Sequence, residues 1–241
     1  MMFTGFTFRD KHSFRDFGMT ISDRKIRNPS KIERKERIPY TNIIYDFSQL
    51  YEGGQEFGTR TVEYWINIAR EQMIRNFHND YFAMETAIVN WLLGGGGQRV
   101  LRDDLIPGFH FLAEVVDRID TDFLWTHGRM KVTFTAYPFK IGDSYEGNDD
   151  WDTFNFLLDY AQVVDFEVSG ELNASIYSVS LYRVRPVIVA SNPLMIHMNG
   201  RQFSVPAGES EDPSFFFNHG ENVMSIFGIG TVEFRFRKEM L

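Results

Sequence analysis

Short runs of alternating apolar and polar residues fill the C-terminal part of the chain, and turn residues separate them. In the last run Val232, Phe234 and Phe236 share one parity, and the residues between them are charged. Asn199-Gly200 lies between two such runs, which is the strongest short signal for a β-hairpin. Many short strands with regular turns predict a β-sandwich or jelly roll over residues 153–241. The strands expected there are 164–168, 175–184, 187–189, 194–198, 202–205, 215–217, 222–227 and 231–237.

The N-terminal part, residues 1–140, predicts a different fold. Runs with strand patterns cover residues 57–74, 99–101, 108–117 and 128–137. One helix is expected, at about residues 80–93, and Gly94 to Gly97 ends it because glycine suits the left-handed C′ position. The stripe expected to face the sheet consists of Phe82, Thr86, Val89 and Leu93, widened by Ala83, Ala87 and Trp91. We therefore predict an α+β domain with a mainly antiparallel sheet and one helix on it.

The opening residues predict the strands that begin this sheet. Phe6 and Phe8 lie two apart, so one face of a short strand is aromatic. The chain then turns through residues 10–13 and re-enters at residues 16–19, which reads as a β-hairpin. Gly18 is the place where a bulge or tight bend costs least.

Composition limits the class of protein. The 241 residues include 24 Phe and are 43% hydrophobic, which is enough for a core and favours strands over helical bundles. The absence of cysteine excludes disulfides, thiolate nucleophiles and Cys-ligated zinc. No run approaches the roughly 18 apolar residues of a membrane helix, and no signal segment opens the chain. We expect a protein without membrane insertion that does not need an oxidising compartment.

Charge is unevenly distributed along the chain. The net charge is −8, yet residues 1–40 carry +5 and the remaining 201 residues carry −13. The basic segment Asp23–Arg37 could be a nucleic-acid arm, a solvated loop, or an arm that meets an acidic neighbouring copy. Glu33 and Glu36 interrupt the run, and the acidic remainder repels phosphate, so the last two interpretations are favoured.

Residues with catalytic or ligand-binding potential form no recognisable motif. The six histidines show no i, i+4 pair on a helix and no alternating pair on a strand, as metal-binding histidines often do. No Gly-x-Ser-x-Gly elbow is present, and Gly94–Gly97 lacks the Gly-Lys-Ser/Thr of a phosphate-binding loop. The histidines are His12, His78, His110, His127, His197 and His219.

The acidic segment 141–152, which we take as an interdomain linker, holds the best candidates for other chemistry. Asp149, Asp150 and Asp152 flank Trp151, and a glycosidase needs two facing carboxylates beside such an aromatic platform. A calcium site over 143–152 fits no standard loop spacing. We favour a solvated linker, and we predict no catalytic residues, no cofactor and no metal site. The sequence identifies no residues of an oligomer interface.

Four groups of residues resemble the distal tail proteins (Dit) of siphophages. The opening is similar in Phe6-Thr7-Phe8, His12-Ser13 and Asp16-Phe17-Gly18-Met19. The middle is similar in a helix that carries Trp91-Leu92-Leu93 before a glycine break, and in Tyr137-Pro138-Phe139-Lys140. The C-terminus is similar in Asn218 to Val223, Gly228-Ile229-Gly230, Val232 to Arg237 and a terminal leucine. The resemblance runs through the whole chain in order.

The resemblance implies a ring-forming N-terminal domain and a galectin-like C-terminal sandwich. It implies a structural virion protein at the tail tip, made in the host cytoplasm, that forms a homo-hexameric hub without enzymatic activity. Implied partners are the tail tube protein, the tape measure protein, a tail-associated fibre or lysin and, as a further class, receptor-binding proteins. DNA would pass through the lumen without specific binding. The alternatives are a monomeric carbohydrate-binding module and, more remotely, a glycoside hydrolase.

Overall fold

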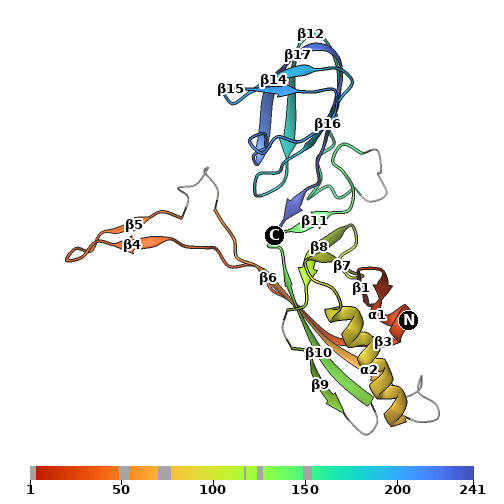
Figure 1. Ribbon diagram of the computed structural model, residues 1–241. Helices are drawn as coiled ribbons and strands as arrows, with labels where there is room; N and C mark the ends of the chain where they lie inside the picture. Colours follow the sequence, from red (N-terminus) through yellow and green to blue (C-terminus); the bar gives the residue numbers. More distant parts are fainter. Residues whose placement is uncertain (1–3, 49–54, 70–76, 117, 124–126, 149–153) are drawn as a thin grey trace. The chain divides into compact units, whose positions relative to one another are not determined.

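The computed structural model describes residues 4–48, 55–69, 77–116, 118–123, 127–148 and 154–241. The chain divides into two compact units, Met1–Lys140 and Ile141–Met240. Each unit is built around its own core of buried apolar side chains. The two units are therefore described separately (Figure 1).

The first unit is an antiparallel sheet with two helices. The sheet has the strand order β2-β1-β7-β8-β10-β6-β3, and β9 pairs with β10. A further pair, β4 with β5, stands outside this sheet. The elements are β1 (Phe6–Phe8), β2 (Lys11–His12), α1 (Ser13–Phe17), β3 (Met19–Ile26), β4 (Lys35–Arg37), β5 (Ile44–Asp46), β6 (Arg60–Ala69), α2 (Phe77–Leu93), β7 (Arg99–Asp103), β8 (Phe109–Glu114), β9 (Asp120–Phe123) and β10 (His127–Ala136).

The two long strands of the first unit place their apolar parity in the core. β6 and β10 pair in continuous antiparallel register, so Val62 lies opposite Phe134 and Ile66 opposite Met130. Since side chains alternate across a strand, every second residue of each strand enters the core. Those residues are fully buried: Val62, Tyr64, Ile66, Ile68, Met130, Val132, Phe134 and Ala136.

The N-terminal residues form a tighter hairpin than predicted: β1 pairs with β2, which lies in the predicted turn, and the re-entering strand predicted for residues 16–19 is wrong in part. Residues Ser13–Phe17 form α1 instead, and the strand begins at Met19. The His12 ring accepts hydrogen bonds from the N–H groups of Phe14 and Arg15, so His12 is the N-cap. Gly18 ends the helix in the left-handed region at φ 63°. Gly18 is thus a helix cap rather than a strand bulge.

Helix α2 forms where the sequence predicts it, but with a different buried face. Phe82 and Leu93 of the predicted stripe are 57% and 43% exposed, whereas Ile88, Trp91 and Leu92 are buried. The Trp91 ring stacks on Phe6 with centroids 5.8 Å apart, and Trp91 Nε1 donates to the Phe8 carbonyl at 3.1 Å. Contacts with the opening strand therefore fix the rotation of this helix.

The second unit is a β-sheet that folds around one core. Its main sheet has the order β15-β14-β17-β13-β16, β12 pairs along the other edge of β17, and β11 pairs with β18. Asn199 and Gly200 join β14 to β15 with φ values of 52° and 72°, as a tight hairpin turn requires. The strands are β11 (Lys140–Gly142), β12 (Asp165–Ser178), β13 (Val187–Ala190), β14 (Leu194–Met198), β15 (Arg201–Val205), β16 (Gly208–Ser210), β17 (Gly220–Arg235) and β18 (Glu239–Met240).

Strand β17 is one continuous strand where the sequence predicted two. It pairs with β14 over Met224–Phe227 and with β13 over Val232–Arg235, while β12 pairs with it from Gly220 to Glu233. Gly228 and Gly230 have φ values of 136° and 148°. Only glycine adopts such values without strain. The strand can therefore change direction at these two residues, and side chains from both of its halves lie in the same core. The prediction of a mainly β chain, with a sandwich-like second half, is confirmed.

Candidate functional site: an exposed arm

The structure describes only some of the residues with catalytic or metal-binding potential. Among the described residues, no group of three or more His, Asp or Glu side chains is placed to hold a metal ion. The four linker residues Asp149 to Asp152 lie outside the described residues, as do the side chains of His78 and His127. In the described part of the chain, no helix is both long and apolar enough to cross a membrane.

The Gly94–Gly97 segment presents carbonyl oxygens, not N–H groups, to its neighbour. The Arg9 guanidinium donates to the carbonyls of Trp91 (3.2 Å), Gly94 and Gly95 (2.7 Å). A cation at this position compensates the negative end of helix α2. The segment is therefore a helix C-terminus held by Arg9.

The described residues of the segment between β3 and β6 contribute no side chain to the buried core of the first unit. We call residues 27–59 the arm; of these, 49–54 lie outside the described residues. Its two sides are joined by backbone hydrogen bonds from Gly58 to Ser30 (2.8 Å), from Ile32 to Glu56 (2.9 Å) and from Phe47 to Arg34 (2.8 Å). Strands β4 and β5 continue this ladder and extend away from the sheet of the unit (Figure 1).

The arm exposes an unusual amount of apolar surface. Among the described residues of the arm, six large apolar side chains are at least 37% exposed, and Tyr40 at the tip is fully exposed. Tyr45 and Phe47 stack on one another with centroids 6.0 Å apart. Isolated two-stranded hairpins are marginally stable in water, and concentrated apolar exposure marks interaction surfaces. The six are Ile32, Tyr40, Ile43, Ile44, Tyr45 and Phe47.

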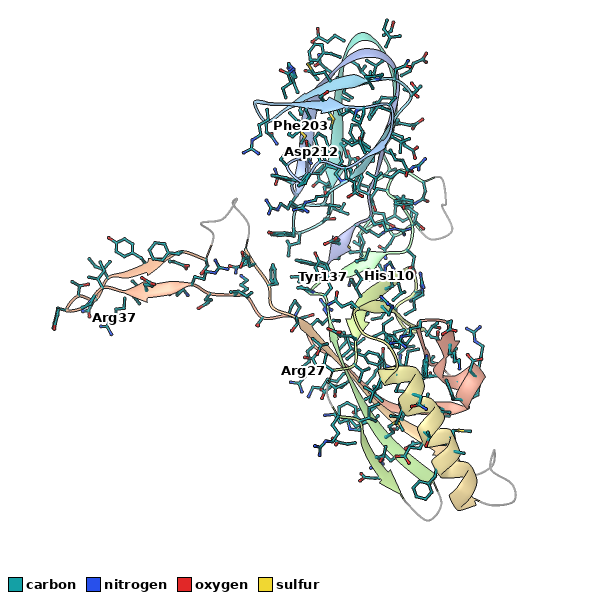
Figure 2. The ribbon with its side chains drawn as sticks, in the orientation of Figure 1. Arg27, Arg37, His110, Tyr137, Phe203 and Asp212 are labelled. Atoms are coloured by element: carbon teal, nitrogen blue, oxygen red, sulfur yellow. The ribbon has the colours of Figure 1, made fainter. Side chains whose placement is uncertain are left out.

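The charges of the arm are also solvent-exposed. Arg34 pairs with Glu56 at 2.7 Å and Lys35 with Glu33 at 2.9 Å. The hydrogen bond with Glu33 raises the pKa of Lys35. Figure 2 shows Arg37 toward the tip and Arg27 at the base of the arm. The basic segment predicted from Asp23 to Arg37 therefore divides: its first residues belong to β3, and the rest lie on the arm.

A buried carboxylate holds the base of the arm. Glu63 on β6 pairs with Lys131 of β10 at 2.7 Å and with Arg27 at 3.0 Å. The hydrogen bond from Lys131, followed by that from Arg27, lowers the pKa of Glu63 despite its burial. This triad fixes the residue at which the chain leaves β3, and thereby where the arm starts.

Sequence reasoning missed the apolar half of this feature. The residues Ile38 to Asn42 are typical of a turn, but no strand or hairpin was predicted on either side of it. The sequence carries part of the signal of a hairpin, namely turn residues at 38–42 followed by a run rich in β-branched and aromatic residues at 43–47. Local sequence cannot show, however, that this hairpin does not pack against the core of its own unit.

Comparison with known proteins adds to this picture. No protein-family model matches the sequence, and no curated protein matches it either. A solved structure matches over the whole chain. The crystal structure of SPP1 Dit (gp 19.1) covers 99% of this chain and 99% of its own, with a TM-score of 0.67 and 9% sequence identity. The chain shares the fold of SPP1 Dit.

Because the match covers 99% of this chain, it spans both units. It confirms, as far as the fold is concerned, the resemblance drawn from the sequence. SPP1 Dit is described as a paradigm of the hub adsorption apparatus in phages that infect Gram-positive bacteria. At 9% identity the likeness is one of fold, so the role of this chain is argued separately below.

Proposed function

We propose that this chain is a distal tail protein, a structural hub at the tip of a siphophage tail. The observation that carries the proposal is the Dit-like fold over 99% of both chains, which in this chain spans two units of unlike architecture. Either unit alone has a common type of architecture that serves many functions. Their combination, together with motifs that resemble the family along the chain, is far more specific.

The exposed arm supports self-assembly. A monomer would leave six large apolar side chains of the arm in water, and the edges of β4 and β5 unpaired. A heterologous interface that closes by rotation covers such a surface on every copy without leaving an open end. We therefore propose that first units form a closed ring of six copies, and that each arm contacts the neighbouring copy.

Within the hub, the second units would project outward as a platform for the adhesion device. The tail tube protein above, the tape measure protein inside and a fibre or lysin below are the proposed partners, with receptor-binding proteins as a further class. The role is structural rather than enzymatic. The charge of −13 over residues 41–241 suits a conduit through which DNA passes without adhering.

The location of the chain in the virion tests this role. An antibody raised against residues 154–241 is used to label intact phage particles that carry the protein, and the label is located by electron microscopy. We expect label only at the end of the tail distal to the capsid. Label along the tube or on the capsid would contradict the proposal.

A second candidate, glycan binding by the second unit, has one observation in its favour. A row of polar side chains crosses the outer face of four strands: Gln202, His197, Ser225 and Asn173 lie in register on β15, β14, β17 and β12. Ser225 donates to Asn173 at 2.7 Å, and the His197 ring lies 4.9 Å from that of Phe227. Amide, imidazole and aromatic groups together suit a sugar ring.

Glycan-array binding by the intact chain separates this candidate from a purely structural role. Glycan binding predicts a discrete set of cell-wall saccharides that is lost in His197→Ala and retained in Glu211→Ala, an exposed residue outside the row. Absence of any saccharide signal would remove this candidate and leave the hub proposal untouched.

A further inference from the structure

Strand β12 has one edge that no strand covers in the part of the chain that the structure describes. It pairs with β17 along its whole length, and its other edge has no strand neighbour. At one end Gln162 takes the place of a neighbour. Its side chain donates to the Tyr177 carbonyl at 2.7 Å and accepts from the Tyr177 N–H at 2.8 Å. Tyr177 therefore directs both backbone groups away from β17.

The register identifies the other residues that face this edge. In an antiparallel pair, backbone groups point alternately toward and away from the partner strand. The register with β17 is continuous, so the residues with the parity of Tyr177 share its orientation. Thr231, opposite Glu167, donates its N–H to Ser191 Oγ on its far side, as this parity requires. Asp165, Glu167 and Ser169 thus present open backbone groups on one side of the bend at Gly170, and their side chains are exposed.

The arm presents a second open edge of the same length. Phe47 donates to the Arg34 carbonyl at 2.8 Å and Ile38 to the Ile43 carbonyl at 3.3 Å, so the even-numbered residues of this strand face β5. The odd-numbered residues face outward. Glu33, Lys35 and Arg37 therefore present open backbone groups, and all three are exposed.

The charges on the two edges select one pairing. Antiparallel alignment places Arg37 opposite Asp165 and Lys35 opposite Glu167, with Glu33 opposite the neutral Ser169. Parallel alignment would instead bring Glu33 against Asp165. Pairing of β12 with a second β12 would bring carboxylates together, which directly opposed like charges make unfavourable.

We propose that the outward edge of β4 pairs antiparallel with the Asp165–Ser169 edge of β12 in a second copy of this chain. The pairing rests on the proposed hub, because it makes the second unit of one copy the acceptor of the arm of another. Three residue pairs provide up to about six backbone hydrogen bonds. Strand addition at an open sheet edge is a common mode of recognition, with side chains supplying specificity.

Cysteine cross-linking between copies tests this pairing directly. The chain contains no cysteine, so two single variants, Lys35→Cys and Glu167→Cys, form a mixed disulfide only if position 35 of one copy meets position 167 of another. A size tag on one variant distinguishes the mixed dimer from dimers of either variant alone. Facing residues in a sheet have the Cα separation that a disulfide needs. Lys35→Cys mixed with Glu211→Cys is the control, because Glu211 is exposed in the same unit outside β12.

The expected result is at least about fivefold more mixed dimer for positions 35 and 167 than for the control pair. A yield equal to the control overturns the pairing. Light scattering on the same unoxidised sample separates the two proposals: a multi-copy mass with no excess of mixed dimer rejects the pairing and retains the ring. A single-copy mass with no mixed dimer counts against both.

A charge exchange provides an independent check that needs no cysteine. Lys35→Glu places two carboxylates opposite one another and is expected to raise the concentration of half-assembly by about tenfold. The second change Glu167→Lys on the same chain is expected to restore assembly. If Glu167→Lys worsens the effect of Lys35→Glu, the two residues do not face one another and the pairing is wrong.

Discussion

Gly228 is the residue on which the bend of β17 depends most. A Cβ added there would lie 2.5 Å from Leu194 Cδ2, and its φ of 136° is strained for any L side chain. We expect Gly228→Ala to lower the free energy of unfolding of the second unit by about 2–4 kcal/mol. Thermal or urea unfolding of the variant and the native chain measures this loss.

Gly170 separates the two causes, because it lies opposite Gly228 at φ 96° but in open space. Gly170→Ala should show the backbone strain alone, about 1–2 kcal/mol. Equal losses in both variants would mean that contact with Leu194 contributes nothing at Gly228.

Glu63 at the base of the arm gives a pH-dependent prediction. Its pKa is lowered from the ordinary 4.5 by the hydrogen bonds from Lys131 and Arg27. Its stabilising effect is therefore fully present above pH 4.5 and is lost as the pH falls through the lower folded-state pKa. Glu63→Gln should lower the Tm at neutral pH, and the difference from the native chain should narrow as the pH falls below 4.5.

Glu36 on the arm supplies the control, because it is exposed. Glu36→Gln should leave the Tm nearly unchanged at neutral pH. If the gap for Glu63→Gln widened toward low pH, the ion-pair account of this site would be wrong.

At the scale of the element, we expect the arm to contribute to assembly of copies and little to the stability of the folded chain. Tyr45 and Phe47 are exposed and stack on one another. Replacing both with serine should change the free energy of unfolding by no more than about 0.5 kcal/mol, because surface substitutions rarely do more. The same change should weaken assembly at least about tenfold, as measured by light scattering over a concentration series.

Val116 offers a matched control, since it is 66% exposed in the same unit but outside the arm. Val116→Ser should alter neither quantity. Loss of assembly in this control, or none in the arm variant, would contradict an assembly role for the arm.

Elements that follow from local alternation could be predicted from the sequence, and those that depend on distant contacts could not. The β14–β15 hairpin follows from Asn199-Gly200 and its flanking alternation. The buried face of α2 does not follow from the sequence. Apolar residues lie around much of that helix, so their spacing does not show which face is buried. Contacts of Trp91 with Phe6 and Phe8 determine the buried face.

The structural role of glycine was predicted wrongly in two places, because the effect of a positive φ depends on residues elsewhere in the chain. Gly18 was read as a strand bend because His12, an uncommon N-cap, conceals the helix before it. The sequence predicts separate strands at 222–227 and 231–237, on either side of Gly228 and Gly230, whereas β12 has its own positive-φ glycine, Gly170, opposite Gly228 and keeps the ladder continuous. A positive φ can end a strand or bend it, and only the partner strand decides which.

At the scale of the whole molecule, the fold and the charge distribution agree with the proposed hub. The outward edge of the arm carries Lys35 and Arg37, whereas the Asp165–Ser169 edge of β12 carries two carboxylates. Opposite charges on these two edges favour assembly of the chain with itself, with a surface on each copy for the arm of another.

The mass of the purified chain in solution tests the central claim most directly. Light scattering coupled to size exclusion should give six or twelve times 28.2 kDa, because a ring closed by heterologous contacts has no partly occupied interface. A mass of 28.2 kDa at every accessible concentration would contradict a ring that closes through this chain alone.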